Sequence, residues 1–318
     1  MTPTQLRAYA AVARHGSARA AAEELGVSEA AISSHTAALR RELDDPLYHR
    51  SGQGLAFTPG GLRLAMRAVE MLGLQDQTRQ EVMAASQGRR ILRLATTSLF
   101  AEHAAPGLIE LFKTRADDLD VEMSVHGSSR FSELLATRRV DVAIAPTVGA
   151  AGDSFRRCEF LRYQLILMVG AQHRLAGKRA DAESLRSCLW VLGPSAVEST
   201  GAGAQLLERF GVPEANQRIF QSHGAAISEA QQGRGIAIVP EFRARHYRGA
   251  GGLEPISAPG ASAAGVWSAT TLARGQAPAV ADELMRFITT PRATQAMLAG
   301  TGARIDRFRP SVHITLWS

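Results

Sequence analysis

The sequence predicts an α/β protein made of a small, mainly helical amino-terminal domain, a long connecting helix and a larger α/β domain with two lobes. Three observations predict this arrangement. Two short helix patterns meet at a glycine turn within residues 17–43, one long helix pattern covers residues 60–87, and strands alternate with helices from residue 91 onward. A chain of 318 residues is long enough for several domains, which we expect at residues 1–58, 59–90 and 91–318.

The two short helices are predicted from their start residues. Ser17 and Ser28 each precede a helix-forming run, where a serine hydroxyl can accept hydrogen bonds from free backbone N–H groups. Gly26 supplies the tight turn, and Val27 is expected to fill the corner between the helices. Two small residues allow a close crossing, Ala21 and Ala22. Such a unit fits a DNA groove, although an alanine-rich hairpin of any helical bundle has the same pattern.

The second of these helices has two distinct faces. Apolar or small residues recur at helical spacing and predict an inward stripe of Ile32, Thr36, Leu39 and Leu43. The opposite face carries mostly short side chains, which suit a close approach to another surface: Glu29, Ala30, Ser33, Ser34 and Ala37.

A hairpin and a further helix start follow. Residues 47–50 read Leu-Tyr-His-Arg, and residues 51–58 form a short polar hairpin with two glycines, which is typical of a wing. The next helix begins with the sequence Thr-Pro-Gly-Gly at residues 58–61. Together these elements resemble the winged helix-turn-helix domain of LysR-type transcriptional regulators. The resemblance covers nearly the whole chain, because a linker helix and a two-part sensor domain follow in the family's order.

The resemblance implies a set of DNA contacts. Carried over residue by residue, these are Ser17, Arg19, Ser28, Glu29, Ala30, Ser33, Ser34, His35, Arg50 and Gln53. This chain departs from the family at Glu29 and Ala30, where glutamine and proline are common, and at Gln53 and Ala56, where arginines are usual. A glutamate can accept a hydrogen bond from cytosine N4, but it cannot read adenine through two hydrogen bonds. We therefore do not expect a relative's operator sequence to apply to this protein.

The long helix is predicted to mediate self-association. Its apolar residues are Leu62, Ala65, Met66, Val69, Leu72, Val82, Met83 and Ala85. The polar stretch 73–81 argues against a continuous coiled coil, and packing on the chain's own sensor domain is the alternative. In the family this helix pairs two subunits, which implies a homodimer on an inverted-repeat operator of double-stranded DNA and a homotetramer as a larger assembly. Residues 86–90 are interpreted as a hinge.

The third domain is predicted to be a two-lobed α/β domain. Strands are expected at residues 91–98, 120–126, 140–145, 165–169, 188–192, 218–220, 235–240 and 266–272. Helices are expected at residues 104–115, 131–137, 203–210, 225–232 and 279–289. The resemblance is to a periplasmic-binding-protein-like effector domain, with lobe I at 91–161 and 266–318 and lobe II at 162–265. Pro310–Ser318 is interpreted as an added short strand.

Hydroxyl residues at strand ends are the candidate effector contacts. Positional resemblance assigns Thr97, Ser98, Ser128, Ser199, Thr200 and Ser222 to this role. Helix N-termini near strand ends present free N–H groups to anions, so a small anionic metabolite is expected as the effector. Arg130 and His223 are candidate partners for its carboxylate, or surface residues. Helix capping is the alternative role of the hydroxyl residues.

Other function classes have weaker support. The sequence lacks catalytic, phosphate-loop and metal-binding motifs, so we expect no enzyme activity, cofactor or metal. A net charge of +6 suits a polyanionic partner, but residues 1–90 carry 11 Arg against 9 acidic residues, an excess of only +2. No membrane span or secretory signal is evident, which indicates a cytoplasmic protein. The alternatives are a cytoplasmic small-molecule-binding protein and a redox-responsive regulator that uses Cys158 and Cys188.

Overall fold

The computed structural model describes residues 1–51, 54–147, 152–198, 201–249 and 252–299, and it divides into two compact units. The amino-terminal unit contains residues 1–87 together with 136–139, and the effector unit contains the rest of the chain. Within the described residues, no helix is both long enough and apolar enough to span a membrane.

The amino-terminal unit consists of four helices and a two-stranded hairpin. In chain order these are α1 (Pro3–His15), α2 (Ala18–Leu25), α3 (Glu29–Leu43), β1 (Tyr48–Ser51), β2 (Gly54–Phe57) and α4 (Pro59–Ser86). The strands pair antiparallel, with His49 opposite Ala56. The helix-turn-helix, the hairpin and the long helix predicted from the sequence are therefore all present.

Local signals determine where these helices begin. The hydroxyl of Ser17 accepts a hydrogen bond from the Ala20 N–H at 3.4 Å, and that of Ser28 accepts one from the Ala31 N–H at 3.2 Å. Thr58 caps α4 in the same way and also donates to the Asp45 carboxylate at 2.7 Å. The predicted capping by Ser17 and Ser28 is confirmed, and Thr58 caps a third helix; each side chain satisfies an N–H that has no partner inside its helix.

Apolar residues form the core between α1, α2 and α3: Ala8, Ala11, Val12, Ala21, Ala22 and Ile32. The predicted inward positions of Ala21, Ala22 and Ile32 are confirmed. Two core predictions are wrong. Val27 is 46% exposed, because its N–H bonds back to the Ala22 carbonyl and the turn directs the side chain away from the crossing. Leu43 is 39% exposed, because it is the last residue of α3, beyond the buried residues Ile32, Thr36 and Leu39.

The effector unit is built on a nine-stranded sheet. Its strands are β3 (Arg90–Thr96), β4 (Leu119–Val125), β5 (Val142–Pro146), β6 (Phe155–Gly170), β7 (Trp190–Leu192), β8 (Gln217–Ile219), β9 (Ile236–Pro240), β10 (Leu253–Pro255) and β11 (Ser262–Leu272). The strand order is β4-β3-β5-β11-β6-β9-β7-β8, and β10 pairs with β6. Parallel pairs occur at each end, β3 with β4 and β5 in lobe I and β7 with β8 and β9 in lobe II.

Helices connect these strands. They are α5 (Ser98–His103), α6 (Ala105–Lys113), α7 (Phe131–Ala136), α8 (Ala182–Arg186), α9 (Ala202–Arg209), α10 (His223–Gln231), α11 (Glu241–Tyr247), α12 (Ala279–Phe287) and α13 (Pro291–Ala299). The helix predicted at 104–115 is present as α6, but the sequence did not predict α5, which is separated from α6 at Ala104. Pro106 has no N–H to continue α5 and instead lies in the first turn of α6. The sequence did not predict α13, and the strand predicted at Pro310–Ser318 lies outside the described residues.

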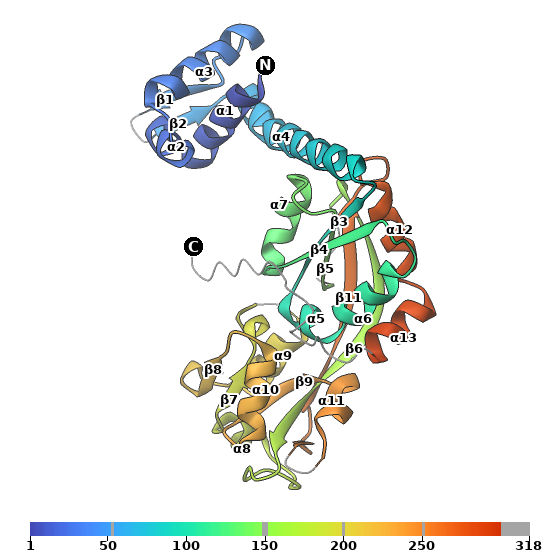
Figure 1. The fold of residues 1–318 in the computed structure, drawn as a ribbon. Helices are drawn as coiled ribbons and strands as arrows, with labels where there is room; N and C mark the ends of the chain where they lie inside the picture. Colours follow the sequence, from blue (N-terminus) through green and yellow to red (C-terminus); the bar gives the residue numbers. More distant parts are fainter. Residues whose placement is uncertain (52–53, 148–151, 199–200, 250–251, 300–318) are drawn as a thin grey trace. The chain divides into compact units, whose positions relative to one another are not determined.

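Two long strands connect the lobes. β6 and β11 pair antiparallel along the whole of β11 and run side by side from one lobe into the other (Figure 1). The predicted strands at 165–169 and 266–272 were too short, because each was inferred from only part of a longer run. The expected lobe boundaries at 161/162 and 265/266 therefore fall inside continuous strands. The pairing register shifts between Trp267 and Ser268, close to these boundaries.

Aromatic residues fill the core near this register shift. Trp267 is fully buried and stacks on Tyr163 with ring centroids 4.1 Å apart, and Phe100 packs edge-on against Trp267 at 5.1 Å. Each such pair adds about 1 kcal/mol beyond its buried area. This packing anchors α5, which carries the predicted effector residue Ser98 and directly follows Thr97.

Candidate DNA-binding face and effector site

The second helix of the helix-turn-helix, α3, presents the face predicted to contact DNA. Ile32, Thr36 and Leu39 are buried, and the Thr36 hydroxyl donates to the Ile32 carbonyl at 2.9 Å. The opposite face is exposed, as expected: Glu29, Ala30, Ser33, Ser34 and Ala37. His35 is half-buried at the side of this face. The exposed face is thus short-chained and lies on a helix whose other side is fixed in the core.

The remaining predicted DNA contacts differ in whether their side chains are free to reach DNA. The hydroxyls of Ser17 and Ser28 already cap helices. Arg19 is exposed and pairs with Glu23 one turn away, Nε to Oε1 at 3.2 Å, an exposed pair of the kind that contributes little stability. Arg50 belongs to β1, and nothing is described of its side chain. Gln53 lies outside the described residues.

Thr97 and Ser98 lie where β3 passes into α5. The Thr97 side chain is buried, and its hydroxyl has no hydrogen-bond partner among the described residues. Ser98 Oγ lies 3.3 Å from Nε2 of His223, a residue of lobe II. A buried hydroxyl without a partner carries a desolvation cost of about 1–3 kcal/mol. Among the predicted effector contacts that the structure describes, Thr97 is therefore the one whose hydroxyl could gain a hydrogen bond from a ligand.

His223 joins the two lobes. Its Nε2 also lies 3.0 Å from Ser195 Oγ, in the 3-10 turn η2 (Pro194–Val197) after β7. Burial lowers the pKa of His223 to about 4, so the imidazole is neutral near pH 7. Gly193 is required for this packing, because a Cβ there would lie 2.3 Å from Nδ1 of the imidazole. Of the two alternatives for His223, the surface position is wrong, because the side chain is buried and its Nε2 contacts two serine hydroxyls.

Glu102 was not predicted as a site residue. Its carboxylate accepts hydrogen bonds from the backbone N–H groups of His223 and Gly224, both at 2.9 Å, at the start of α10. Ser222 caps the same helix by accepting from the Ala225 N–H at 3.0 Å. Burial raises the pKa of Glu102, while the two N–H bonds lower it. One signal was available in the sequence, because Ser98 and Glu102 are four residues apart and share a face of a short helix whose residues between them are apolar.

A second carboxylate meets the other predicted contact of lobe I. Ser128, in the 3-10 turn η1 (Ser128–Arg130), donates to Glu198 Oε2 at 3.0 Å. Burial raises the pKa values of Glu198 and Tyr163, and the charge of Glu198 raises the pKa of Tyr163 further. Ser199 and Thr200 lie outside the described residues. Arg130 is exposed. Of the six predicted effector residues, the structure therefore places Ser98, Ser128 and Ser222 in contacts or caps at the two lobes.

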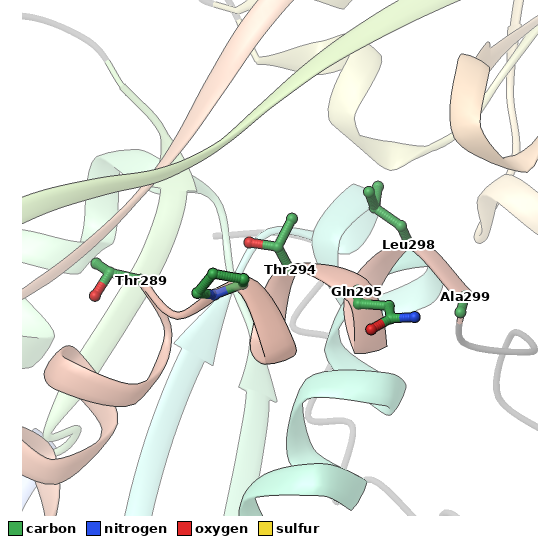
Figure 2. A pocket seen from close by; sticks show the side chains of 6 residues that line it. Thr289, Thr294, Gln295, Leu298 and Ala299 are labelled. Carbon is green, nitrogen blue, oxygen red and sulfur yellow. The ribbon is translucent and has the colours of Figure 1, made fainter.

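The structure gives less support for a redox site or a metal site. Both cysteines are free thiols. Burial raises the pKa of Cys158, and Cys188 Sγ accepts from Arg174 at 3.1 Å. The described part of the chain has no group of three or more metal-ligating side chains. Figure 2 shows the residues that line a surface hollow, which lie on α13 and just before it: Thr289, Pro291, Thr294, Gln295, Leu298 and Ala299. None of the predicted effector residues lines this hollow.

Comparison with known families agrees with this architecture. Residues 3–62 match the bacterial regulatory helix-turn-helix protein family, lysR family, and residues 85–291 match the LysR substrate binding domain. The chain belongs to the LysR family. It is a LysR-type DNA-binding transcriptional regulator, and this family is one of transcriptional regulators rather than enzymes.

The similarity to relatives and to solved structures covers most of the chain. An HTH-type transcriptional regulator of Mycobacterium tuberculosis is 53% identical over 322 residues, which cover both chains completely. The fold is similar to that of CbnR, a LysR family transcriptional regulator, at a TM-score of 0.56 and 20% identity over 93% of this chain and 99% of that one. Full-length OxyR from Pseudomonas aeruginosa gives a TM-score of 0.54 and 19% identity over 91% and 97%.

Proposed function

We propose that this LysR-type regulator binds an inverted-repeat operator as a homodimer or homotetramer, and that a small effector held between the lobes of its effector unit changes its activity. The observation that carries the DNA part is the exposed, short-chained face of α3, whose other face is buried in the core. A helix presented in this way can lie close to base edges in the major groove.

Base reading is assigned to α3. Ser33 and Ser34 can hydrogen-bond with several bases, and Glu29 can accept from cytosine N4. Arg19 and Arg50 are assigned to phosphates, which position a protein on DNA without selecting its sequence. We therefore infer that changes on α3 alter sequence preference, whereas changes at the arginines weaken binding to all sequences.

Self-association is assigned to the linker helix α4. Six large apolar side chains on it are exposed within the described chain: Leu62, Met66, Met71, Leu74, Val82 and Met83. A row of exposed apolar residues at this density is typical of a surface that another molecule covers. A second copy of α4 is the proposed partner, because pairing of identical surfaces produces the two-fold symmetry that an inverted repeat matches.

The effector response is assigned to the residues where the lobes meet. Thr97 supports this assignment, since its buried hydroxyl lacks a partner among the described residues and a ligand could supply one. The effector must bind two arrangements of the subunits with different affinities, because otherwise it could not shift the equilibrium between them.

The first experiment is selection of genomic DNA fragments by the purified full-length protein, followed by footprinting of the best fragment. We expect protection of an inverted repeat. Ser34→Ala is expected to change the selected sequence, and Arg50→Ala to weaken binding to all fragments alike. No selective binding by folded protein would contradict the operator proposal, and equal losses on every sequence for both variants would contradict the division of roles.

A further inference from the structure

The N–H groups of the first four residues of α10 all have hydrogen-bond partners within the described chain. Helix starts attract anions because their first N–H groups lack partners inside the helix and lie at the positive end of the helix dipole. In this helix, Glu102 accepts from the N–H groups of His223 and Gly224, and the Ser222 hydroxyl accepts from that of Ala225. The next N–H, of Ala226, bonds the Ser222 carbonyl at 3.3 Å. The chain itself therefore occupies this anion-binding position.

The Glu102 carboxylate is compensated by the helix start. No Lys, Arg or His side chain forms an ion pair with it among the described residues. A partly buried carboxylate without a cation depends on its hydrogen-bond donors, which here are the two backbone N–H groups. A second carboxylate or phosphate at the same place would meet both a filled position and a like charge.

The same contact connects the lobes. Glu102 lies on α5, which follows β3 of lobe I, whereas α10 precedes β9 of lobe II. Two more polar contacts join these lobes, Ser98 with His223 and Ser128 with Glu198. Glu102 differs from the serines because it carries the charge that an effector's anionic group would bring.

We propose that Glu102 is a built-in anion that determines the specificity of the effector site. Its carboxylate takes the position of an effector carboxylate or phosphate at α10, excludes such groups from that position, and holds the lobes in contact without a ligand. The proposal rests on the effector site proposed above. It revises the expected anionic metabolite to an effector whose group nearest α10 carries no negative charge.

Chemical rescue tests this proposal in the full-length protein. Glu102→Ala removes a CH₂–COO⁻ group, which acetate reproduces almost atom for atom. We expect the variant's effector unit to melt about 2 °C or more below the wild type, since a loss of 1 kcal/mol shifts the melting temperature of a domain of this size by roughly 2–4 °C. Sodium acetate should restore most of that shift, and sodium chloride at equal ionic strength should not.

Two controls accompany the rescue. Glu110→Ala removes an exposed carboxylate from the neighbouring helix α6, and we expect neither a lower melting temperature nor a specific effect of acetate. Glu102→Gln keeps the size of the side chain and one acceptor oxygen. It should remain folded, shift the backbone amide signal of Gly224, and show no rescue because the position is filled.

Three results would overturn the proposal. The first is that acetate raises the melting temperature of the wild type as much as that of Glu102→Ala. The second is that Glu102→Ala melts at the same temperature as the wild type. The third is that Glu102→Gln leaves the backbone amide signal of Gly224 unchanged. If Glu102→Ala does not fold, the backbone amide signal of Gly224 is the test. The proposal then requires that this signal differ between the wild type and Glu102→Gln, and that acetate not shift it in the wild type. Operator binding by the wild type is measured separately, so failure of the regulator proposal and failure of the Glu102 proposal give different results.

Discussion

At the residue scale, the imidazole of His223 is packed against a residue with no side chain. A Cβ at Gly193 would lie 2.3 Å from Nδ1 and 2.6 Å from two ring carbons of His223. We expect Gly193→Ala to displace the ring and to lower the free energy of unfolding of the effector unit by about 1–3 kcal/mol, as overpacking does elsewhere. Urea unfolding followed by tryptophan fluorescence measures this loss.

Gly203→Ala is the matched control for that substitution. Gly203 lies in α9, and a Cβ there would have no neighbour within 4 Å. The substitution should be neutral or should stabilise the unit by up to about 1 kcal/mol, because alanine loses less conformational freedom than glycine in a helix. Equal losses for both variants would show that the glycine itself, and not the contact with His223, is responsible.

The titration of His223 predicts a pH dependence of stability. Its pKa is about 4 in the folded protein and near 6.5 when unfolded, so between these values the unfolded chain binds the extra proton. The free energy of unfolding should therefore fall as the pH falls from about 6.5 to about 4, by up to about 3 kcal/mol from this residue. The lowered pKa of buried His103 acts in the same direction, whereas the raised pKa values of Glu102 and Glu198 act in the opposite one.

Comparison with His223→Gln isolates this contribution. The variant should be less stable than the wild type near pH 7, and the difference should shrink as the pH falls through this window. Urea unfolding curves between pH 7.5 and 4.5 measure the difference. Parallel stability curves for the two proteins would contradict the assignment of the effect to His223.

At the element scale, α3 separates residues that build the helix from residues that it presents. Ser28 caps α3, so Ser28→Ala should lower the free energy of unfolding of the amino-terminal unit by about 1 kcal/mol. Ser33 lies exposed in the same helix, so Ser33→Ala should leave stability unchanged or raise it by about 0.5 kcal/mol. Thermal unfolding followed by circular dichroism compares the two variants.

Footprinting on the selected operator completes this comparison. Ser33→Ala should change the sequence preference although it does not destabilise the helix, because its side chain lies on the exposed face. If Ser33→Ala bound every fragment like the wild type, the base-reading role of that residue would be wrong. If Ser28→Ala cost no stability, the cap would not contribute as its geometry indicates.

At the scale of the whole molecule, one face of α4 carries the predicted self-association. Met71, Leu74 and Val82 are exposed and, with Thr78, recur at intervals of three and four residues, so they lie along one side of the helix. We expect Val82→Glu to weaken dimerisation at least about tenfold, because a loss of about 1.4 kcal/mol of burial free energy is enough. Sedimentation equilibrium measures the dissociation constant.

Gln80→Glu is the matched control. It adds the same charge at an exposed position, but two residues before Val82 and therefore nearly on the opposite side of α4. Its dissociation constant should equal that of the wild type. Equal weakening by both variants would indicate a general effect of negative charge, and no weakening by Val82→Glu would place the interface elsewhere.

The sequence by itself determined the elements with local signals. Ser17, Ser28 and Thr58 precede helices whose starts they cap, and a left-handed glycine ends α2, so neighbouring residues alone specify the helix-turn-helix and the beginning of α4. The exposed face of α3 followed from helical periodicity for the same reason. The alternation of strands and helices likewise predicted the α/β class of the effector unit.

Only the tertiary structure decided how distant segments meet. Strands β6 and β11 extend through both lobes because they pair with each other. The residue pattern of a strand does not indicate which other strand it will pair with. Glu102 accepts a hydrogen bond from the N–H of His223, a residue 121 positions away in the sequence. Glu198 accepts one from Ser128, 70 positions away. Burial and hydrogen bonding between such residues depend on the folded packing. For this reason the sequence indicated the serines at the effector site, whereas the carboxylates that meet the predicted contacts became evident only in the fold.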